Sequence, residues 1–123
     1  MPQKLILIID DDNRNIFALK AVLKAKGFEC LSATSAREGF SIMEERAHVA
    51  VVLMDMMMPD MDGYQAMAAM KKSAKMQNIP VLAVTAQAMV GDKERCLTAG
   101  ASGYVSKPIN VDELLTQILE VTI

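Results

Sequence analysis

The stretch VVLMDMMMPDMDGY, residues 51–64, joins an apolar run directly to a carboxylate and a turn. The apolar part lacks the polar alternation of a half-exposed strand, which is typical of a parallel strand covered on both faces. Asp55 ends this run, and Gly63 allows the backbone to bend shortly afterwards. Asp55 is therefore either the polar end of a buried strand or a carboxylate held at a reactive edge.

Composition and charge indicate a single small globular domain. At 123 residues the chain can enclose one hydrophobic core, and its 52% apolar and 23% charged residues are ordinary for such a protein. The net charge of −2 gives no electrostatic case for nucleic acid, and no apolar run reaches the length of a membrane span. Cys30 and Cys96 have no disulfide-like spacing. We therefore expect one cytoplasmic domain over residues 1–123, with no nucleic-acid partner and no membrane insertion.

Short apolar runs alternate with helical patterns along the whole chain. The runs are typical of buried parallel strands and occupy residues 4–10, 28–33, 49–54, 80–85 and 102–106. Amphipathic spacing, capping residues and glycine stops predict helices over residues 14–26, 35–46, 63–75, 91–99 and from 110 onward. This alternation predicts right-handed crossovers and a doubly wound α/β fold with helices on both faces of a parallel sheet.

Polar residues gather where the predicted strands end. In doubly wound sheets, ligands bind outside the carboxyl ends of the strands, at the switch point of the topology. Residues 10–12 follow the first run, and Asp55, Thr85 and Lys107 follow the third, fourth and fifth runs. We therefore expect several carboxylates, a hydroxyl and an amine to lie close together at one edge of the sheet.

This set of groups suits phosphoryl chemistry with a metal ion. Clustered carboxylates cannot all stay ionised without an offsetting charge, and Mg²⁺ prefers such oxygen ligands. With Mg²⁺ bound, Asp55 can act as a nucleophile that accepts a phosphoryl group as an acyl phosphate. The remaining task is to neutralise the negative charge of the transferred group, for which Lys107 and Thr85 are suitably placed.

Four motifs in this order carry a family resemblance. They are DD at 10–11, DMMMPDMDG at 55–63, VTA at 84–86 and GYVSKPI at 103–109. Together they resemble the receiver domain of two-component response regulators, most closely the receivers of hybrid histidine kinases and stand-alone single-domain regulators. The resemblance runs from Lys4 to the end of the chain. It implies a flavodoxin-like (βα)₅ fold whose parallel strands have the order 2-1-3-4-5.

The resemblance assigns a phosphoacceptor and a magnesium site. By this comparison Asp55 is the phosphoacceptor and also a ligand of Mg²⁺. Asp11 binds Mg²⁺ directly, Asp10 acts mainly through water, and the backbone carbonyl of Met57 completes the protein ligands. Water approaches the acyl phosphate past Met57 and Gln87, and because the methionine side chain cannot polarise water we expect slow self-hydrolysis.

The resemblance also assigns the residues that respond to phosphorylation. Thr85 bonds a phosphoryl oxygen and shifts on activation, and Tyr104 is an aromatic switch that turns inward with it. Lys107 pairs with the phosphate, and the Lys107–Pro108 peptide bond is expected to be cis.

The implied function is a signalling switch rather than turnover of a metabolite. A histidine kinase or a histidine phosphotransfer protein supplies phosphohistidine, and the chain catalyses its own phosphorylation and slow dephosphorylation. The change remodels a face formed by residues 91–99, 102–106 and 110 onward, which a downstream effector recognises. The alternative is a receiver-like interaction module that binds partners without phosphorylation. The sequence fits a free-standing regulator and a domain of a hybrid kinase equally well.

Several nearby residues have simpler interpretations. Asp12 is expected to cap the first helix, and Asp60 and Asp62 are expected to be turn residues. His48 is expected at the surface, with no role in phosphotransfer. The methionines around Asp55 offer soft sulfur to a site of hard oxygen ligands, so we expect them to be packing residues and site walls. DDDNRN resembles the start of a calcium loop, but its spacing lacks the required glycine and glutamate.

Overall fold

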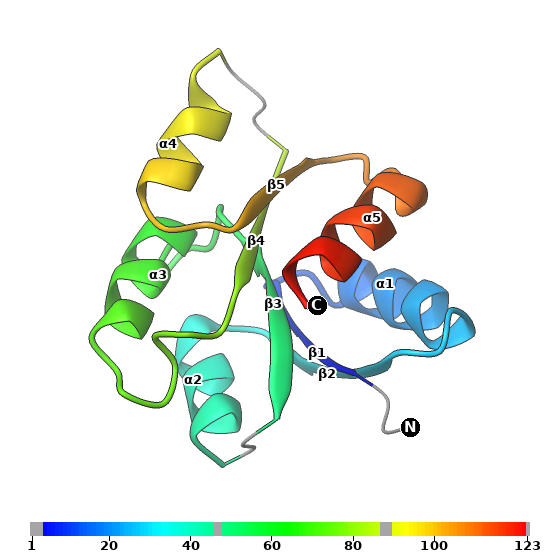
Figure 1. The fold of residues 1–123 in the computed structure, drawn as a ribbon, viewed down its shortest axis with the longest axis horizontal. Coiled ribbons are helices and arrows are strands. Elements are labelled where there is room, and N and C mark those ends of the chain that lie inside the picture. The colour runs from blue at the N-terminus through cyan, green and yellow to red at the C-terminus, as the bar shows by residue number, and fades with distance from the viewer. Residues whose placement is uncertain (1–3, 46–47, 87–89, 123) are drawn as a thin grey trace.

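A five-stranded parallel sheet with helices on both faces forms the protein (Figure 1). The computed structural model describes residues 4–45, 48–86 and 90–122. The strands are β1 Leu5–Ile9, β2 Glu29–Ala33, β3 Val49–Asp55, β4 Val81–Thr85 and β5 Gly103–Ser106. The helices are α1 Asn13–Ala25, α2 Ala36–Glu45, α3 Gly63–Lys71, α4 Asp92–Thr98 and α5 Val111–Val121. The strand order is β2-β1-β3-β4-β5, which confirms the predicted doubly wound topology.

The core lies in two layers, one on each side of the sheet. Helices α1 and α5 cover one face, and α2, α3 and α4 cover the other (Figure 1). Alternate residues of β1 serve the two layers, since Leu7 packs with one cluster and Ile8 with the other. This is why the β1 sequence is apolar at every position: both of its faces are covered, and burying each such side chain contributes about 1.5–3 kcal/mol.

The predicted helices are confirmed, with one end misplaced. The helix expected over residues 63–75 ends at Lys71. There the amide of Ser73 donates to the carbonyl of Met70 at 3.1 Å, three residues back, so the last turn tightens and the chain leaves the helix axis. The end expected near Arg46 for α2 falls outside the described residues.

Aspartate side chains cap α1 and α3, two of the helices that begin at the carboxyl edge of the sheet. The carboxylate of Asp12 accepts from the amide of Arg14 at 2.9 Å, as expected of an N-cap. Asp62 was expected to be a turn residue, but it is the N-cap of α3 and forms a capping box with Gln65. Helix α1 ends at Ala25, and Gly27 follows at φ +92, a conformation that favours glycine, as its position after the helical pattern predicts.

None of the described helices has the length and apolar character needed to cross a membrane. His48 is exposed, as expected. The free thiols are Cys30, which is half-buried, and Cys96, which is buried.

We expect Gly63→Ala to destabilise the fold, because a side chain at Gly63 has no room. A Cβ there would lie 2.9 Å from the Cα of Met56 and would overlap the Met56 side chain. Overpacking of this kind costs about 1–3 kcal/mol, which urea unfolding measures as a lower free energy of unfolding. Helix propensity alone predicts that alanine would raise the free energy of unfolding. A variant at least as stable as the wild type would therefore contradict this account of the β3–α3 turn.

Candidate functional site

The strand register brings the polar residues to one edge of the sheet. Ile9 of β1 pairs with Met54 of β3, so the next residues, Asp10 and Asp55, leave neighbouring strands at the same level. On the other side of β3, Asp55 pairs with Val84, and Thr85 follows at the end of β4. The carboxyl ends of β1, β3 and β4 therefore meet as the sequence predicts.

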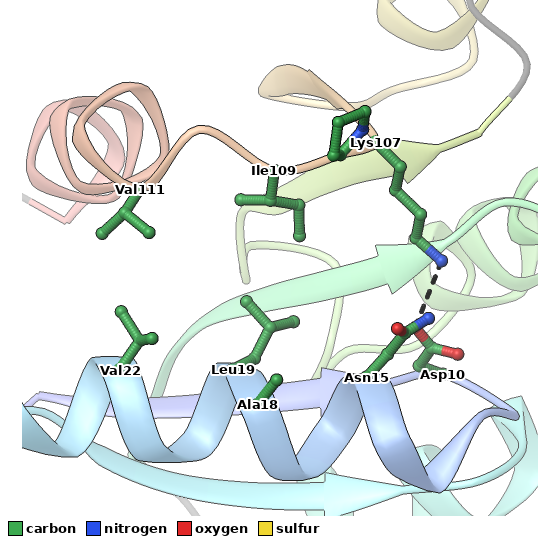
Figure 2. A pocket seen from close by; sticks show the side chains of 9 residues that line it. Asp10, Asn15, Ala18, Leu19, Val22, Lys107, Ile109 and Val111 are labelled. Carbon is green, nitrogen blue, oxygen red and sulfur yellow. Dashed lines mark hydrogen bonds and ion pairs between the residues drawn. The ribbon is translucent and has the colours of Figure 1, made fainter.

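Asp10 is buried and held by three donors. Its Oδ1 accepts from the amide of Asp12 at 2.8 Å. Its Oδ2 lies 3.4 Å from Nζ of Lys107 and 3.5 Å from Nδ2 of Asn15. Figure 2 shows the side chains of Asn15 and Lys107 directed toward Asp10 from α1 and from the segment after β5. The position of the Asp10 carboxylate is therefore set by its own loop, by α1 and by Lys107.

Asp55 is a buried carboxylate whose charge is only partly compensated. Only 5% of the residue is exposed, its Oδ1 accepts from the amide of Met57 at 3.0 Å, and its Oδ2 lies 3.9 Å from Nζ of Lys107. The pKa of Asp55 is raised to about 6, with burial as the largest cause; the Met57 amide and Lys107 act to lower it, and the nearby Asp10 acts to raise it. At neutral pH the carboxyl group is mainly ionised, and a nearby cation would stabilise its negative charge.

The third acid completes a candidate metal centre. Carboxylate oxygens of Asp10, Asp11 and Asp55 all lie within 4.8 Å of one another, and Asp11 is exposed while the other two are buried. Lys107 provides one ammonium to two of these three acids. The donor set consists of hard oxygens with an excess of negative charge, which fits a divalent cation such as Mg²⁺. Because Asp11 is exposed to solvent, an ion and its waters can enter the site from that side.

Thr85 and Tyr104 occupy different surroundings. Thr85 is 2% exposed at the end of β4, and its carbonyl accepts from the amide of Lys107 at 2.8 Å, which ties the β5 end to the site. Tyr104 lies in β5, and its hydroxyl donates to Oδ2 of Asp92 at 2.9 Å. The tyrosine side chain is therefore bonded to the start of α4.

The remaining expected features are placed as follows. Met57 is 51% exposed in the loop after β3, and its amide bonds Asp55; its carbonyl as a metal ligand stays a prediction. The Lys107–Pro108 bond is cis, as predicted. Gln87 lies outside the described residues. The expected packing role of the methionines is confirmed for those that are buried beside the site, namely Met54, Met56 and Met58.

Two hollows flank the carboxylates. One, with a volume of about 310 Å³, lies between α1 and α5, and most of its wall is apolar (Figure 2). Its polar end consists of Asp10, Asn15 and Lys107. The other, of about 580 Å³, extends from Asp11 over the loop after β3 to Arg95. The acidic cluster is therefore open to approach from both sides.

Sequence reasoning missed several contacts of this region. Asn15 and Asp92 were not singled out, although they bond Asp10 and Tyr104. Tyr64 was also missed, and its hydroxyl lies 3.3 Å from Oδ1 of Asp92. The tyrosines could have been singled out by their rarity, because they are the only two in the chain. No periodicity or motif indicated that both of them contact the same carboxylate.

Comparison with known families finds a match over nearly the whole chain. Residues 6–119 match the family model of the response regulator receiver domain. Among curated proteins, the chain is similar to the polar-differentiation response regulator DivK of Brucella ovis. The two are 33% identical over 115 residues, which cover 94% of this chain and 93% of DivK.

Solved structures of similar fold include receiver domains from Methanospirillum hungatei JF-1 and Pseudomonas aeruginosa PAO1. The CheY-like receiver domain protein from Methanospirillum hungatei has a TM-score of 0.85 and 32% identity, covering 97% of this chain and 93% of its own. The receiver domain of the sensor histidine kinase PA1611 from Pseudomonas aeruginosa PAO1 has a TM-score of 0.87 and 27% identity, covering 98% of each chain. That structure holds a magnesium ion coordinated in its active site cleft.

We expect Asp55→Asn to stabilise the metal-free protein in a pH-dependent way. Because the pKa of Asp55 is raised from 3.8 to about 6 in the folded chain, its ionisation opposes folding increasingly as the pH rises from 3.8, and the full cost is present above about pH 6. The asparagine removes the charge and keeps an acceptor for the Met57 amide. The free energy of unfolding should rise by up to about 3 kcal/mol at pH 7.5. This gain should shrink as the pH falls from 6 toward 3.8, where the folded wild-type carboxyl becomes protonated.

Urea unfolding at a series of pH values in the presence of a chelator measures this difference. The matched control is Asp60→Asn, an exposed acid of the same loop, which should change stability by less than about 0.5 kcal/mol at any pH. A gain for Asp55→Asn that does not vary with pH, or a loss at pH 7.5, would contradict the burial of an uncompensated charge at this position.

Proposed function

The chain belongs to the family of response regulator receiver domains, and from this premise we propose that Asp55 accepts a phosphoryl group from a phosphohistidine. The observation that carries the proposal is the position of Asp55: it is the last residue of β3, buried, with Lys107 Nζ at 3.9 Å and two further acids within 4.8 Å. A carboxylate that served only to end a strand would need neither the amine nor the second and third acids.

The proposed reaction is a phosphoryl transfer to the carboxylate. An oxygen of Asp55 forms a bond to phosphorus while the phosphorus–nitrogen bond of the donor breaks, and the electron pair of that bond stays on the imidazole. The Met57 amide fixes Oδ1 of Asp55, which orients the nucleophile. Lys107 moves from pairing with two carboxylates to neutralising the transferred group, over the short distance that separates it from Asp55. Thr85, at the end of the next strand, donates its hydroxyl to a phosphoryl oxygen.

The residues that would hold Mg²⁺ are Asp11 and Asp55 directly, Asp10 through water, and the backbone carbonyl of Met57. The fit rests on the cluster of three carboxylates, and the magnesium ion in the PA1611 receiver supports it. Bound there, Mg²⁺ offsets the negative charge that collects on the phosphoryl oxygens. Asp10 remains in place through the amide of Asp12 when Lys107 turns toward the phosphoryl group.

Phosphorylation then changes the surface that binds a downstream partner. Thr85 and Tyr104 move together, and the face formed by α4, β5 and α5 changes its shape for a downstream effector. The donor partner is a histidine kinase or a histidine phosphotransfer protein. The chain catalyses its own phosphorylation and a slow hydrolysis of the acyl phosphate. Its expected site of action is the cytoplasm.

The alternative is an interaction module that keeps the receiver fold without phosphorylation. Such a module would have no need for a buried carboxylate with a raised pKa, because keeping an ionised group there costs stability. The presence of all three acids and of Lys107 therefore favours the phosphorylated switch.

We expect an Mg²⁺-dependent mass increase of one phosphoryl group when the protein is incubated with acetyl phosphate. The reason is that Asp55 needs the metal to offset the charge of the donor as it approaches two other acids. Intact-mass spectrometry should show the gain in the wild type and lose it in Asp55→Asn. The matched control is Asp12→Asn, which alters an acid that caps α1 rather than one of the clustered carboxylates, and it should still be phosphorylated.

A gain that persists in Asp55→Asn would contradict the assignment of the phosphoacceptor. If the wild type shows no gain, a titration with beryllofluoride and Mg²⁺ separates the two functions. A domain that accepts only from its own kinase still binds this phosphoryl analogue at Asp55, whereas an interaction module without phosphorylation does not.

A further inference from the structure

One carboxylate at the start of α4 contacts both tyrosines of the chain. Asp92, the first residue of α4, accepts at Oδ2 from the hydroxyl of Tyr104 in β5 at 2.9 Å. At Oδ1 it accepts from the hydroxyl of Tyr64 in α3 at 3.3 Å. The α3, α4 and β5 elements are therefore joined through a single side chain, on the face of the sheet that α3 and α4 cover (Figure 1).

The two tyrosines are held to α4 unequally. Tyr64 has three contacts with this helix: its hydroxyl reaches Asp92 and lies 3.4 Å from Sγ of Cys96, and its ring lies 4.3 Å below the guanidinium of Arg95. Burial raises the pKa of Tyr64 above its ordinary value, so its hydroxyl stays protonated as a donor. Among the described residues, Asp92 is the one side chain that bonds the hydroxyl of Tyr104. Tyr64 is therefore an anchor, and Tyr104 is the partner that can be released.

The backbone of Tyr104 is fixed from the opposite face. Its amide donates to Oε1 of Gln117 at 3.0 Å, and its carbonyl accepts from Nε2 of Gln117 at 2.9 Å. Gln117 belongs to α5, so β5 is clamped at this residue from the α5 side. Movement of Tyr104 is therefore confined to rotation of its side chain. Such a rotation must break the bond to Asp92 or draw the first turn of α4 along with it.

We propose that Asp92 is a positioning residue that sets the free-energy cost of the switch by holding Tyr104 to α4 in the unphosphorylated chain. The inference rests on the proposed function, in which Tyr104 moves when Asp55 is phosphorylated. When Tyr104 leaves, Tyr64 remains as a donor to Asp92, so the carboxylate keeps a partner in both states. Tyr64 thereby lowers the cost of release, and Asp92 raises it.

These opposite roles give opposite changes in the affinity for a phosphoryl analogue. Removal of the tether in Asp92→Ala should favour the switched state and tighten beryllofluoride binding by about fivefold or more, since a hydrogen bond to a charged group corresponds to about tenfold or more in an equilibrium constant. Tyr64→Phe removes the second donor and should weaken binding by about twofold to fivefold. In the double variant the Tyr64→Phe effect should disappear, because the carboxylate that it serves is gone.

Isothermal calorimetry with beryllofluoride and Mg²⁺ measures these affinities on the full chain. The matched control is Asp112→Ala, which removes an acid from the first turn of α5 and should leave the affinity unchanged. Tyrosine fluorescence gives a second readout, because the chain contains two tyrosines and no tryptophan, so the signal comes from the two residues whose hydroxyls contact Asp92. Beryllofluoride should change that signal in the wild type, and the change should be smaller in Asp92→Ala.

The outcomes separate a positioning role from a structural one. A lower melting temperature for Asp92→Ala with an unchanged beryllofluoride affinity would overturn the inference, since it would mean that Asp92 only supports the fold. If Asp92→Ala does not fold, Asp92→Asn keeps the shape and one acceptor oxygen and should tighten binding by a smaller factor; an unchanged affinity there overturns the inference as well. A wild type that binds no beryllofluoride would overturn the proposed function itself. This outcome is distinct from the others because the Asp112→Ala control would then also fail to bind.

Discussion

The charge balance at the carboxyl edge of the sheet is the constraint on which the site depends. The parallel register places Asp10 and Asp55 at adjacent strand ends, and Asp11 adds a third carboxylate within reach. One ammonium, that of Lys107, lies between the two buried acids and compensates them only in part. Burial, together with this deficit of positive charge, explains the raised pKa of Asp55, and the deficit also explains the affinity for a divalent cation that we propose.

The parallel sheet could be predicted because the signals were local and mutually consistent. Apolar runs without alternation indicated parallel strands, and their alternation with helical patterns indicated a doubly wound sheet. The strand order came from the resemblance of the four motifs to receiver domains. The predictions failed where a single residue had two possible roles. Asp62 resembles a turn residue by type, but it caps α3, and only the reciprocal contact with Gln65 distinguishes the two. The predicted end of α3 was wrong because no residue pattern indicates the tightened turn at Ser73.

The acidic cluster could be predicted for a geometric reason that does not extend to the tyrosine contacts. Strand ends converge at one edge in any doubly wound sheet, so residues that follow strands are neighbours whatever the detail of packing. The contacts of Asp92 with Tyr64 and Tyr104 depend instead on how α4 lies against α3 and β5, which no periodicity encodes. The phosphoacceptor site and this tyrosine cluster are joined through the short β5 strand, which carries Tyr104 and leads directly to Lys107.

The identity of the residue that carries the phosphoryl group is the central claim, and chemical trapping tests it most directly. Borohydride reduces an aspartyl phosphate to homoserine, which peptide mass spectrometry locates after the protein has reacted with a small phosphodonor and Mg²⁺. Homoserine at position 55 is the expected result. Reduction at Asp10 or Asp11, or a phosphoryl group found on His48 instead, would contradict the assignment and require a different nucleophile for this site.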